Sequence, residues 1–203
     1  MKIVDQSVEL LWVTPDAEKM IEAAGRTCYR SGYLITDDSA AKFAKRMTDL
    51  GHHAMIEHAV ASMRIVTNRG ISHEIVRHRI CSFAQESSRW ISYKSKGGEI
   101  TFIEPTFKTP EEREVWVSLC EESERAYMKL IELGAAPQWA RSVLPNSTKT
   151  EIVMTCNFRE WMHFIKLRTS KTAHPEIRWV ANECLKILKK HSPSVFGSIP
   201  EVE

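Results

Sequence analysis

The sequence predicts a single domain of mixed α/β (α+β) class covering residues 1–203. A chain of this length is long enough for one sizeable domain and short for two, and its composition, 43% hydrophobic and 27% charged, is ordinary for a globular protein. Segments with strand character alternate with segments of helical period at uneven spacing. No strand leads into a glycine-rich turn, so neither a Rossmann fold nor a P-loop is predicted.

The predicted strands are rich in β-branched residues and alternate between apolar and polar positions. They cover residues 2–13, 59–67, 100–103 and 148–157. Trp90 to Tyr93 is also expected to be extended, before a polar, glycine-containing loop over residues 94–99.

The predicted helices follow from apolar spacing and from capping residues. The first begins at a Thr14 cap and Pro15 and runs to about Arg26, and the second runs from capping residues at 37–39 to residue 50. A third runs from residue 71 or 72 to residue 77. The others cover residues 111–133, 158–168 and 176–190, and a short helical turn covers residues 137–145. On the long helix we expect the packing face to hold Val115, Leu119, Ala126, Leu130 and Leu133. On the helix over 158–168 we expect a polar stripe of Arg159, His163 and Lys166, and apolar contacts from Trp161, Phe164, Ile165 and Leu167.

Charge and cysteine content restrict the class of protein. The chain has 28 basic and 26 acidic residues, so it has no global field that would attract nucleic acid, and anion binding must be local. The five cysteines form no Cys-x-x-Cys pair, which indicates a reducing compartment and neither a disulfide framework nor a zinc ribbon. With no apolar run of membrane-spanning length and no signal sequence, the prediction is a cytoplasmic protein that does not bind membranes.

The most informative stretch is Arg77 to Arg89, Arg-His-Arg-Ile-Cys-Ser-Phe-Ala-Gln-Glu-Ser-Ser-Arg. It combines three arginines, a histidine and three hydroxyls, and arginine is the side chain that binds phosphate through two parallel hydrogen bonds. If the preceding helix reaches Arg77, then Glu74, Arg77 and His78 share one side of it at i, i+3 and i+4. The stretch predicts an anion site.

Two groups of histidines raise the possibility of a metal site. His73 and His78 superficially resemble a zinc protease signature, but their spacing of five turns them about 140° apart around a helix, whereas a shared metal requires a spacing of four. The run from His52 to His58 has no outlying ligand with standard spacing, so we favour hydrogen bonding for it. No metal is predicted.

Arg77-His78-Arg79, seven residues and then Ser87 reproduce the Arg-His-Arg-x7-Ser signature of the flavin-dependent thymidylate synthases, the ThyX family. Other segments are similar to that family in the same order. They are Gly51-His52 to Glu57-His58, Ser82 to Trp90, Ala140 to Pro145, Asn157-x-Arg159, Leu167-Arg168 and Ala173 to Arg178. The resemblance therefore extends from residue 51 to residue 178.

The resemblance implies a methyltransferase that makes dTMP from dUMP. In this family 5,10-methylenetetrahydrofolate gives the carbon and NADPH gives the hydride through bound FAD. It also implies a homotetramer with shared active sites, and a central, mostly antiparallel sheet flanked by helices.

The resemblance also implies roles for individual residues. The candidates for FAD binding are Ser31, Glu57, Arg77, His78, Arg79, Gln85, Asn157, Arg159, His163 and His174. The candidates for dUMP binding are Glu74, Arg77, Gln85, Glu86, Ser87, Ser88, Arg89, Arg141 and Arg168. Arg168 matches the family's activating arginine, which polarises the uracil and stabilises negative charge at N3 and O4.

Three alternatives remain open at this stage. A non-catalytic flavin- or nucleotide-binding protein on the same fold would be expected to lack Arg168 or the Arg-His-Arg run, and both are present. A phosphate-recognising nucleic-acid module is disfavoured by the near-zero net charge. Classical thymidylate synthase uses a cysteine after a proline, whereas no cysteine here follows one, and Cys81 is expected to be a small core residue.

Some positions depart from the family pattern. Ala54 stands where relatives often have a hydroxyl residue, and the loop from Arg168 to His174 is longer than in some relatives. Glu74, Gln85 and Trp90 also differ from residues seen in some members. These departures affect individual contacts and leave the family resemblance intact.

Overall fold

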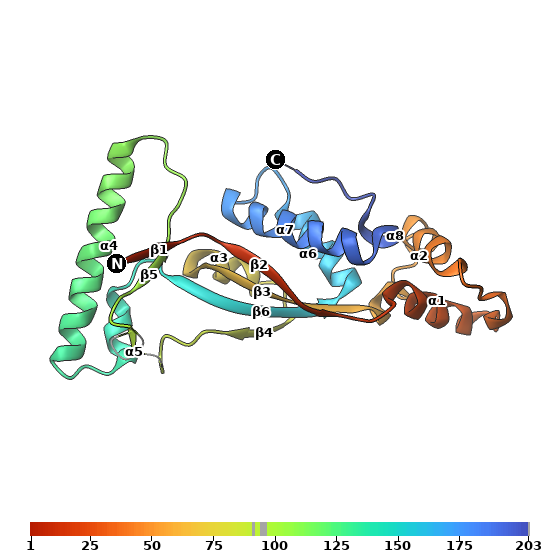
Figure 1. Cartoon of the computed structure of the whole chain (residues 1–203), viewed down its shortest axis with the longest axis horizontal. Coiled ribbons are helices and arrows are strands. Elements are labelled where there is room, and N and C mark those ends of the chain that lie inside the picture. Colours follow the sequence, from red (N-terminus) through yellow and green to blue (C-terminus); the bar gives the residue numbers. More distant parts are fainter. Residues whose placement is uncertain (91, 94–96, 203) are drawn as a thin grey trace. The chain divides into compact units, whose positions relative to one another are not determined.

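The computed structural model describes residues 1–90, 92–93 and 97–202 and shows a mixed α/β protein (Figure 1). Its contacts divide the chain into two compact units. The first unit comprises Met1–Ser7, Val66–Glu74 and Ala84–Ile152, and the second comprises Val8–Ile65, Ile75–Phe83 and Val153–Glu203. Each unit draws on separate stretches of the chain, and the expectation of one functional domain over residues 1–203 stays a prediction.

The main sheet has four strands in the order β2-β3-β6-β4. Their bounds are β2 Ser7–Val13, β3 Val60–Asn68, β6 Lys149–Asn157 and β4 Ser82–Gln85. At one end of β3 the N–H of Arg69 donates to the carbonyl of Thr148 at 3.0 Å, and at the other end the N–H of Phe158 donates to the carbonyl of Ala59 at 2.8 Å. Residue numbers therefore rise along β3 as they fall along β6, which is the antiparallel arrangement. The expected antiparallel sheet is confirmed.

The strand predictions failed in three places. The expected single strand over residues 2–13 is two strands, because β1 (Lys2–Val4) pairs in parallel with β5 (Thr101–Ile103) in a separate sheet. Strand β4 was not predicted, because its residues lie inside a polar motif. Trp90 lies in a turn rather than in extended chain, and residues 91 and 94–96 of the expected strand and loop fall outside the described residues.

The first unit is organised around α4 (Pro110–Glu132), the long helix in Figure 1, which is followed by α5 (Pro137–Ala140) and a 3-10 turn over Arg141–Val143. Thr109 caps α4 with a capping box: its Oγ1 accepts from the N–H of Glu112, whose carboxylate accepts from the N–H of Thr109. Ile100, Phe102, Cys120, Tyr127 and Ala140 form the buried core of this unit.

The packing face expected for α4 is right at Leu130, which packs against the core, and wrong at three other positions. Val115, Leu119 and Leu133 are 73%, 55% and 72% exposed, whereas Cys120 and Tyr127 are buried. The core-facing side therefore centres on Cys120 and Tyr127, with Leu130 and Ile131 packed beside them, and a search for large aliphatic residues at helical spacing finds only part of it.

The second unit contains the remaining long helices. They are α1 (Ala17–Cys28), α2 (Ser39–Asp49), α6 (Phe158–Arg168) and α7 (Pro175–His191). In Figure 1, α1 lies beside α2 and α6 beside α7. Trp161, Phe164 and Ile165 of α6 are fully buried, and the indole N–H of Trp161 donates to the carbonyl of Ala61 at 3.1 Å. Leu167 is 49% exposed, contrary to expectation, because it lies on the opposite side of α6.

Helix boundaries differ from the expectations at two functional points. Thr14 does not cap α1, because its side chain bonds to the backbone of Val60; Asp16 precedes the helix instead. Helix α3 (Arg69–Ile75) ends before Arg77 and His78, so the expected helical stripe of Glu74, Arg77 and His78 is wrong. Short helices at Gly32–Leu34, Ile56–His58 and α8 (Pro193–Phe196) were not predicted. None of the described helices has the length and apolar character of a membrane span.

Candidate functional site

A cavity of about 430 Å³ in the first unit gathers cationic and hydrogen-bonding groups. Arg141 and Ser88 line it, and Arg141 Nη1 donates to Ser88 Oγ at 3.3 Å. Arg89 Nε donates to the Gln138 side chain at 3.2 Å, and the N–H of Arg89 donates to Ser87 Oγ at 3.3 Å. Guanidinium and hydroxyl groups in this arrangement suit a phosphate dianion. Four residues predicted for dUMP thus lie together.

The position of Arg141 follows from local structure. Pro137 begins α5, and the N–H of Leu144 bonds to the Arg141 carbonyl at 3.1 Å to close the 3-10 turn. Ser123 of α4 fixes this turn by donating its hydroxyl to the carbonyl of Val143 at 2.7 Å. The longest helix of the unit therefore holds the turn that presents the arginine.

Sequence reasoning missed two residues that line this cavity, Arg69 and His73 of α3. Asn68 caps this helix, because its side-chain oxygen accepts from the N–H of Ile71 at 2.8 Å. Arg69 and His73 stand four residues apart on one face of the helix. That spacing was visible in the sequence, but His73 was considered only as a metal ligand.

Three other residues of the first unit that were predicted for ligand binding are Glu74, Gln85 and Glu86, and the side chains of the last two bond to other residues of the chain. Gln85 Nε2 donates to Ser72 Oγ at 2.8 Å and to Thr150 Oγ1 at 3.2 Å, and Glu86 pairs with Lys149 at 3.0 Å. Glu74 lies in the last turn of α3 and is half-buried. Their predicted ligand contacts stay predictions.

In the second unit, Arg168 contacts the central residue of the Arg-His-Arg signature. Arg168 Nε donates to His78 Nε2 at 3.1 Å. His78 is buried, whereas its neighbours Arg77 and Arg79 are exposed. Burial lowers the pKa of His78 to about 4, with smaller effects from the charges of Arg168 and His163. The imidazole is therefore neutral near pH 7, and because Nε2 accepts a hydrogen bond, the ring proton resides on Nδ1.

Glu160 faces that ring proton. His78 Nδ1 lies 3.6 Å from Glu160 Oε1, and the thiol of Cys81 contacts the same oxygen at 4.0 Å. The donor atoms of His78, Glu160 and His163 all lie within 4.8 Å of one another, close enough to hold a metal ion. The permanently cationic guanidinium of Arg168 already occupies His78 Nε2, so the arrangement favours an anionic or polar ligand over a metal cation.

Other residues predicted for FAD surround a cavity of about 400 Å³ in the same unit. Glu57, Asn157, Arg159 and His163 line it, and Arg159 Nη1 pairs with Glu57 Oε1 at 2.6 Å. Asn157 also caps α6 by accepting from the N–H of Glu160 at 2.9 Å. His174, by contrast, does not line any of the cavities described here. It caps α7, where its Nδ1 accepts from the N–H of Glu176 at 3.3 Å.

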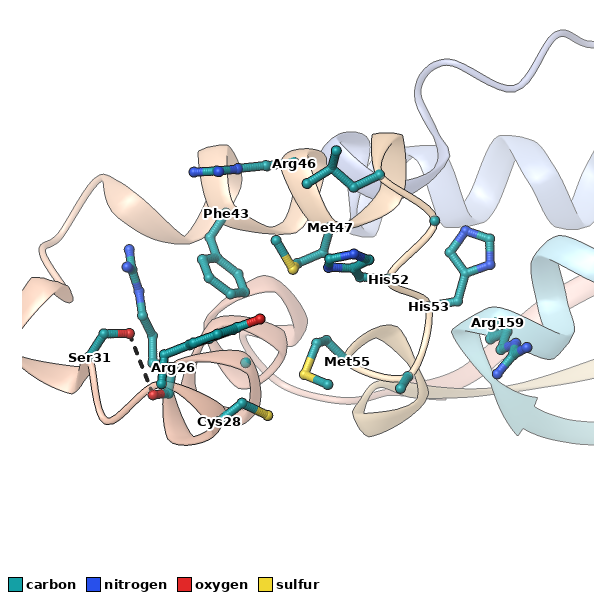
Figure 2. Close-up of a pocket in the computed structure, with 15 residues that line it drawn as sticks. Arg26, Cys28, Ser31, Phe43, Arg46, Met47, His52, His53, Met55 and Arg159 are labelled. Carbon is teal, nitrogen blue, oxygen red and sulfur yellow. Dashed lines mark hydrogen bonds between the residues drawn. The ribbon is translucent and has the colours of Figure 1, made fainter.

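A larger cavity of about 660 Å³ lies between α1, α2 and the segment that follows α2. Figure 2 shows Arg26 and Ser31 at one end and His53 and Arg159 at the other, with Phe43 between them. Arg159 also lines the smaller cavity, so the two cavities share one wall. Ser31 and Arg159, both predicted for FAD, are thus brought together from distant parts of the sequence.

The end of this cavity near Arg26 is held in place by a buried carboxylate. Glu22 is 1% exposed and accepts from Arg26 at 3.0 and 3.1 Å and from Ser39 Oγ at 2.7 Å. Arg26 in turn lies over the ring of Phe43, 4.9 Å from its centroid. Glu22 and Arg26 were not predicted as site residues. Their contacts with Ser39 and Phe43 join two helices, and a local sequence pattern does not show contacts of that kind.

Cys28 is exposed and lines the 660 Å³ cavity, whereas the environment of the other four cysteines does not suit a nucleophile. Cys81, Cys120, Cys156 and Cys184 are buried, and burial raises the pKa of the thiols of Cys120, Cys156 and Cys184, which disfavours the reactive thiolate. The expectation that Cys81 is a small core residue agrees with its 8% exposure.

The fold and these arginine-rich cavities define the class of protein as a mixed α/β protein with sites for anionic ligands. Residues 9–194 match the model of the family described as "Thymidylate synthase complementing protein". The chain therefore belongs to that family, as the Arg-His-Arg signature predicted.

Individual relatives agree with this membership. A protein of Corynebacterium glutamicum named flavin-dependent thymidylate synthase is 40% identical, with 92% of this chain and 81% of the relative covered. A protein of the same name from Geobacter sulfurreducens is 34% identical, with 93% and 84% covered. The crystal structure of the UMP/dUMP methylase PolB from Streptomyces cacaoi, bound with 5-Br dUMP, superimposes with a TM-score of 0.83 over 97% of this chain and 96% of that chain. Its sequence identity is 24%, so this likeness shows the fold alone.

Proposed function

We propose that this protein is a flavin-dependent thymidylate synthase, a methyltransferase that converts dUMP to dTMP. The methylene carbon comes from 5,10-methylenetetrahydrofolate, and the reducing equivalent comes from NADPH by way of FAD. The observation that carries the proposal is the 3.1 Å contact between Arg168 and His78, which joins the signature to the arginine that the resemblance assigns to uracil activation.

The first unit would bind the phosphate of dUMP. Arg141 and Arg89 supply cationic donors, and Ser88 and Ser87 supply hydroxyls. Arginine matches the geometry of a phosphate dianion with two parallel hydrogen bonds, so this cluster orients the nucleotide as well as attracting it.

The residues present in the second unit fit FAD. The middle of the 660 Å³ cavity is lined by Phe43, Met47 and Met55, which suit a flat ring system, and Arg26 and Arg159 place a cationic side chain at each end. Arg77 and Arg79, also predicted for FAD, are exposed and line none of the cavities described above. FAD, when bound, supplies the hydride chemistry, and the protein supplies position and electrostatic field.

Arg168 would act electrostatically on the uracil. Its bond to His78 restricts the orientation of the guanidinium plane, so donors can face the carbonyl oxygen where negative charge develops. A neutral His78 is required for this bond, because an imidazolium would present a donor to a donor. The lowered pKa of His78, about 4, keeps the ring in the accepting form across the neutral range.

We further propose that residues 1–203 act as one synthase domain within a homotetramer that shares active sites. The exposed apolar side chains of Val115, Leu119 and Leu133 on α4 are suited to burial between subunits. Five free cysteines support a reducing, cytoplasmic location.

The proposal is tested by purifying the protein with FAD and following the release of tritium from [5-³H]dUMP. We expect bound flavin, oxidation of NADPH that depends on dUMP, and tritium release only when methylenetetrahydrofolate is present. Arg168→Ala should retain flavin and lose tritium release. A protein that binds flavin and dUMP but releases no tritium under any condition would instead indicate a non-catalytic binding protein.

A further inference from the structure

A third cavity of the second unit, about 770 Å³ in volume, has no role in the function proposed above. Its cationic lining includes Lys166 and Lys171, and Thr169 and Ser170 add hydroxyls between them. Met162, Ile199, Pro200 and Val202 supply an apolar surface. Among the described residues, no aspartate or glutamate lines it, so the cavity has one sign of charge.

The C-terminal wall of this cavity is fixed in place. Asn182 of α7 bonds to both backbone groups of Val202, with its Nδ2 donating to the carbonyl at 2.7 Å and its Oδ1 accepting from the N–H at 3.2 Å. Lys189 pairs with Glu201 at 3.1 Å, which neutralises the Glu201 carboxylate. The cavity is therefore bounded by an ordered part of the chain.

The two lysines are available for a ligand. Lys166 lies in the last turn of α6 and Lys171 in the loop that follows, and both are exposed. Within the part of the chain that the structure describes, neither lysine side chain takes part in an ion pair or a hydrogen bond. Arg159, the arginine of this cavity, is already paired with Glu57. The cationic groups of this cavity that have no acidic partner among the described residues are thus the ammonium groups of Lys166 and Lys171, which lie five residues apart in sequence.

We infer that this cavity binds the glutamyl tail of the folate substrate, with Lys166 and Lys171 pairing with its carboxylates. The inference rests on the proposed function and names a subsite for one of its substrates. The cavity shares His53 and Arg159 with the cavity assigned to FAD, so a folate placed beside the flavin would extend into it. Met162 and Pro200 suit the p-aminobenzoyl ring, and separate lysines suit separate carboxylates.

NADPH fits this cavity less well. Its 2′-phosphate concentrates two negative charges on one group, which the two-pronged guanidinium of arginine binds best, and the one arginine that lines this cavity, Arg159, is assigned above to the FAD cavity. A polyglutamate instead carries its negative charges on separate carboxylates along a chain. Lys166 and Lys171 likewise carry their positive charges on separate ammonium groups.

The test compares folates that carry one and five glutamates. We expect the FAD-loaded wild-type protein to bind pteroylpentaglutamate about three- to tenfold more tightly than the monoglutamate at low salt, as two exposed ion pairs allow. Lys166→Gln/Lys171→Gln should bind both equally. In turnover, the same variant should raise KM for methylenetetrahydrofolate pentaglutamate by a similar factor and leave KM for dUMP and NADPH unchanged.

Lys42→Gln/Lys190→Gln is the matched control, because it removes the same charge from two exposed lysines that do not line the cavity. It should keep the preference for pentaglutamate. Equal binding of the two folates by the wild-type protein, or a preference that survives in the Lys166/Lys171 variant, would overturn the inference. So would a raised KM for NADPH in place of folate. Tight pentaglutamate binding without turnover would count against the proposed function and leave the subsite intact.

Discussion

Replacing His78 by glutamine should remove a large part of the acid sensitivity of this protein. The pKa of His78 is lowered from the ordinary 6.5 to about 4 in the folded protein, chiefly because the ring is buried. The unfolded chain therefore binds this proton at a higher pH than the folded chain does. The stabilisation is fully present above about pH 6.5 and is lost progressively as the pH falls toward about 4.

The size of the effect follows from the two pKa values. Between about pH 7.5 and about pH 5, the linkage relation gives a loss of about 2 kcal/mol in the free energy of unfolding from this one group. The full shift corresponds to about 3 kcal/mol, reached only near pH 4. Glutamine is the informative replacement, because its carbonyl oxygen can accept from Arg168 Nε as the imidazole does and it does not titrate.

The assay is urea unfolding at about pH 7.5 and about pH 5, at one fixed protein concentration because assembly contributes to stability. The difference between the two pH values should be about 2 kcal/mol smaller in His78→Gln than in the wild type. His191→Gln, which alters an exposed histidine in the last turn of α7, should leave the difference unchanged. Equal pH dependence in the wild type and His78→Gln would refute the reasoning, because it would mean that His78 titrates alike in both states.

Four further predictions concern single residues. Arg168→Lys should lower kcat at least about 100-fold, because a point charge does not reproduce the oriented guanidinium, while flavin absorbance stays unchanged; a kcat near the wild-type value would remove Arg168 from its role. Arg141→Lys should raise KM for dUMP about tenfold in steady-state kinetics. Cys81→Ala should keep turnover near the wild-type value and lower stability by about 1 kcal/mol in urea unfolding, and an inactive enzyme would reopen the question of a cysteine nucleophile. Gly25→Ala would place a Cβ 2.4 Å from the ring of Phe43, so we expect a loss of about 1–3 kcal/mol in stability and weaker FAD binding by titration.

The elements that the sequence predicted well are those with a strong local pattern. Helix α7 and strand β6 were placed to within a residue at each end, because apolar spacing, capping residues and alternation agree there. Helix α4 shows the limit of such patterns. Its bounds were predicted, and Leu130 packs against the core as expected, but the buried residues Cys120, Ser123 and Tyr127 give no aliphatic signal.

The site was predictable only as far as its residues belong to a motif. Ser88 and Arg141 lie 53 positions apart, and the family resemblance grouped them for dUMP before the structure showed their contact. His78 and Arg168 lie 90 positions apart and were predicted for different ligands, so their contact was not predicted. Glu160 was missed, because its contact with His78 depends on α3 ending at Ile75. Beyond that point the N–H of His78 bonds to the carbonyl of Ile75, and a turn replaces the helix that helical spacing had suggested.

The Arg77 to Arg89 stretch is divided between the two units. Residues up to Phe83 belong to the second unit, where His78 contacts Arg168, and residues from Ala84 belong to the first, where Ser88 contacts Arg141. Strand β4 carries the chain from one unit to the other. Under the proposed function, a single motif would contribute its first residues to uracil activation and its last residues to phosphate binding. It follows that variants at its two ends should separate kinetically, with those near His78 acting on kcat and those near Ser88 acting on KM for dUMP.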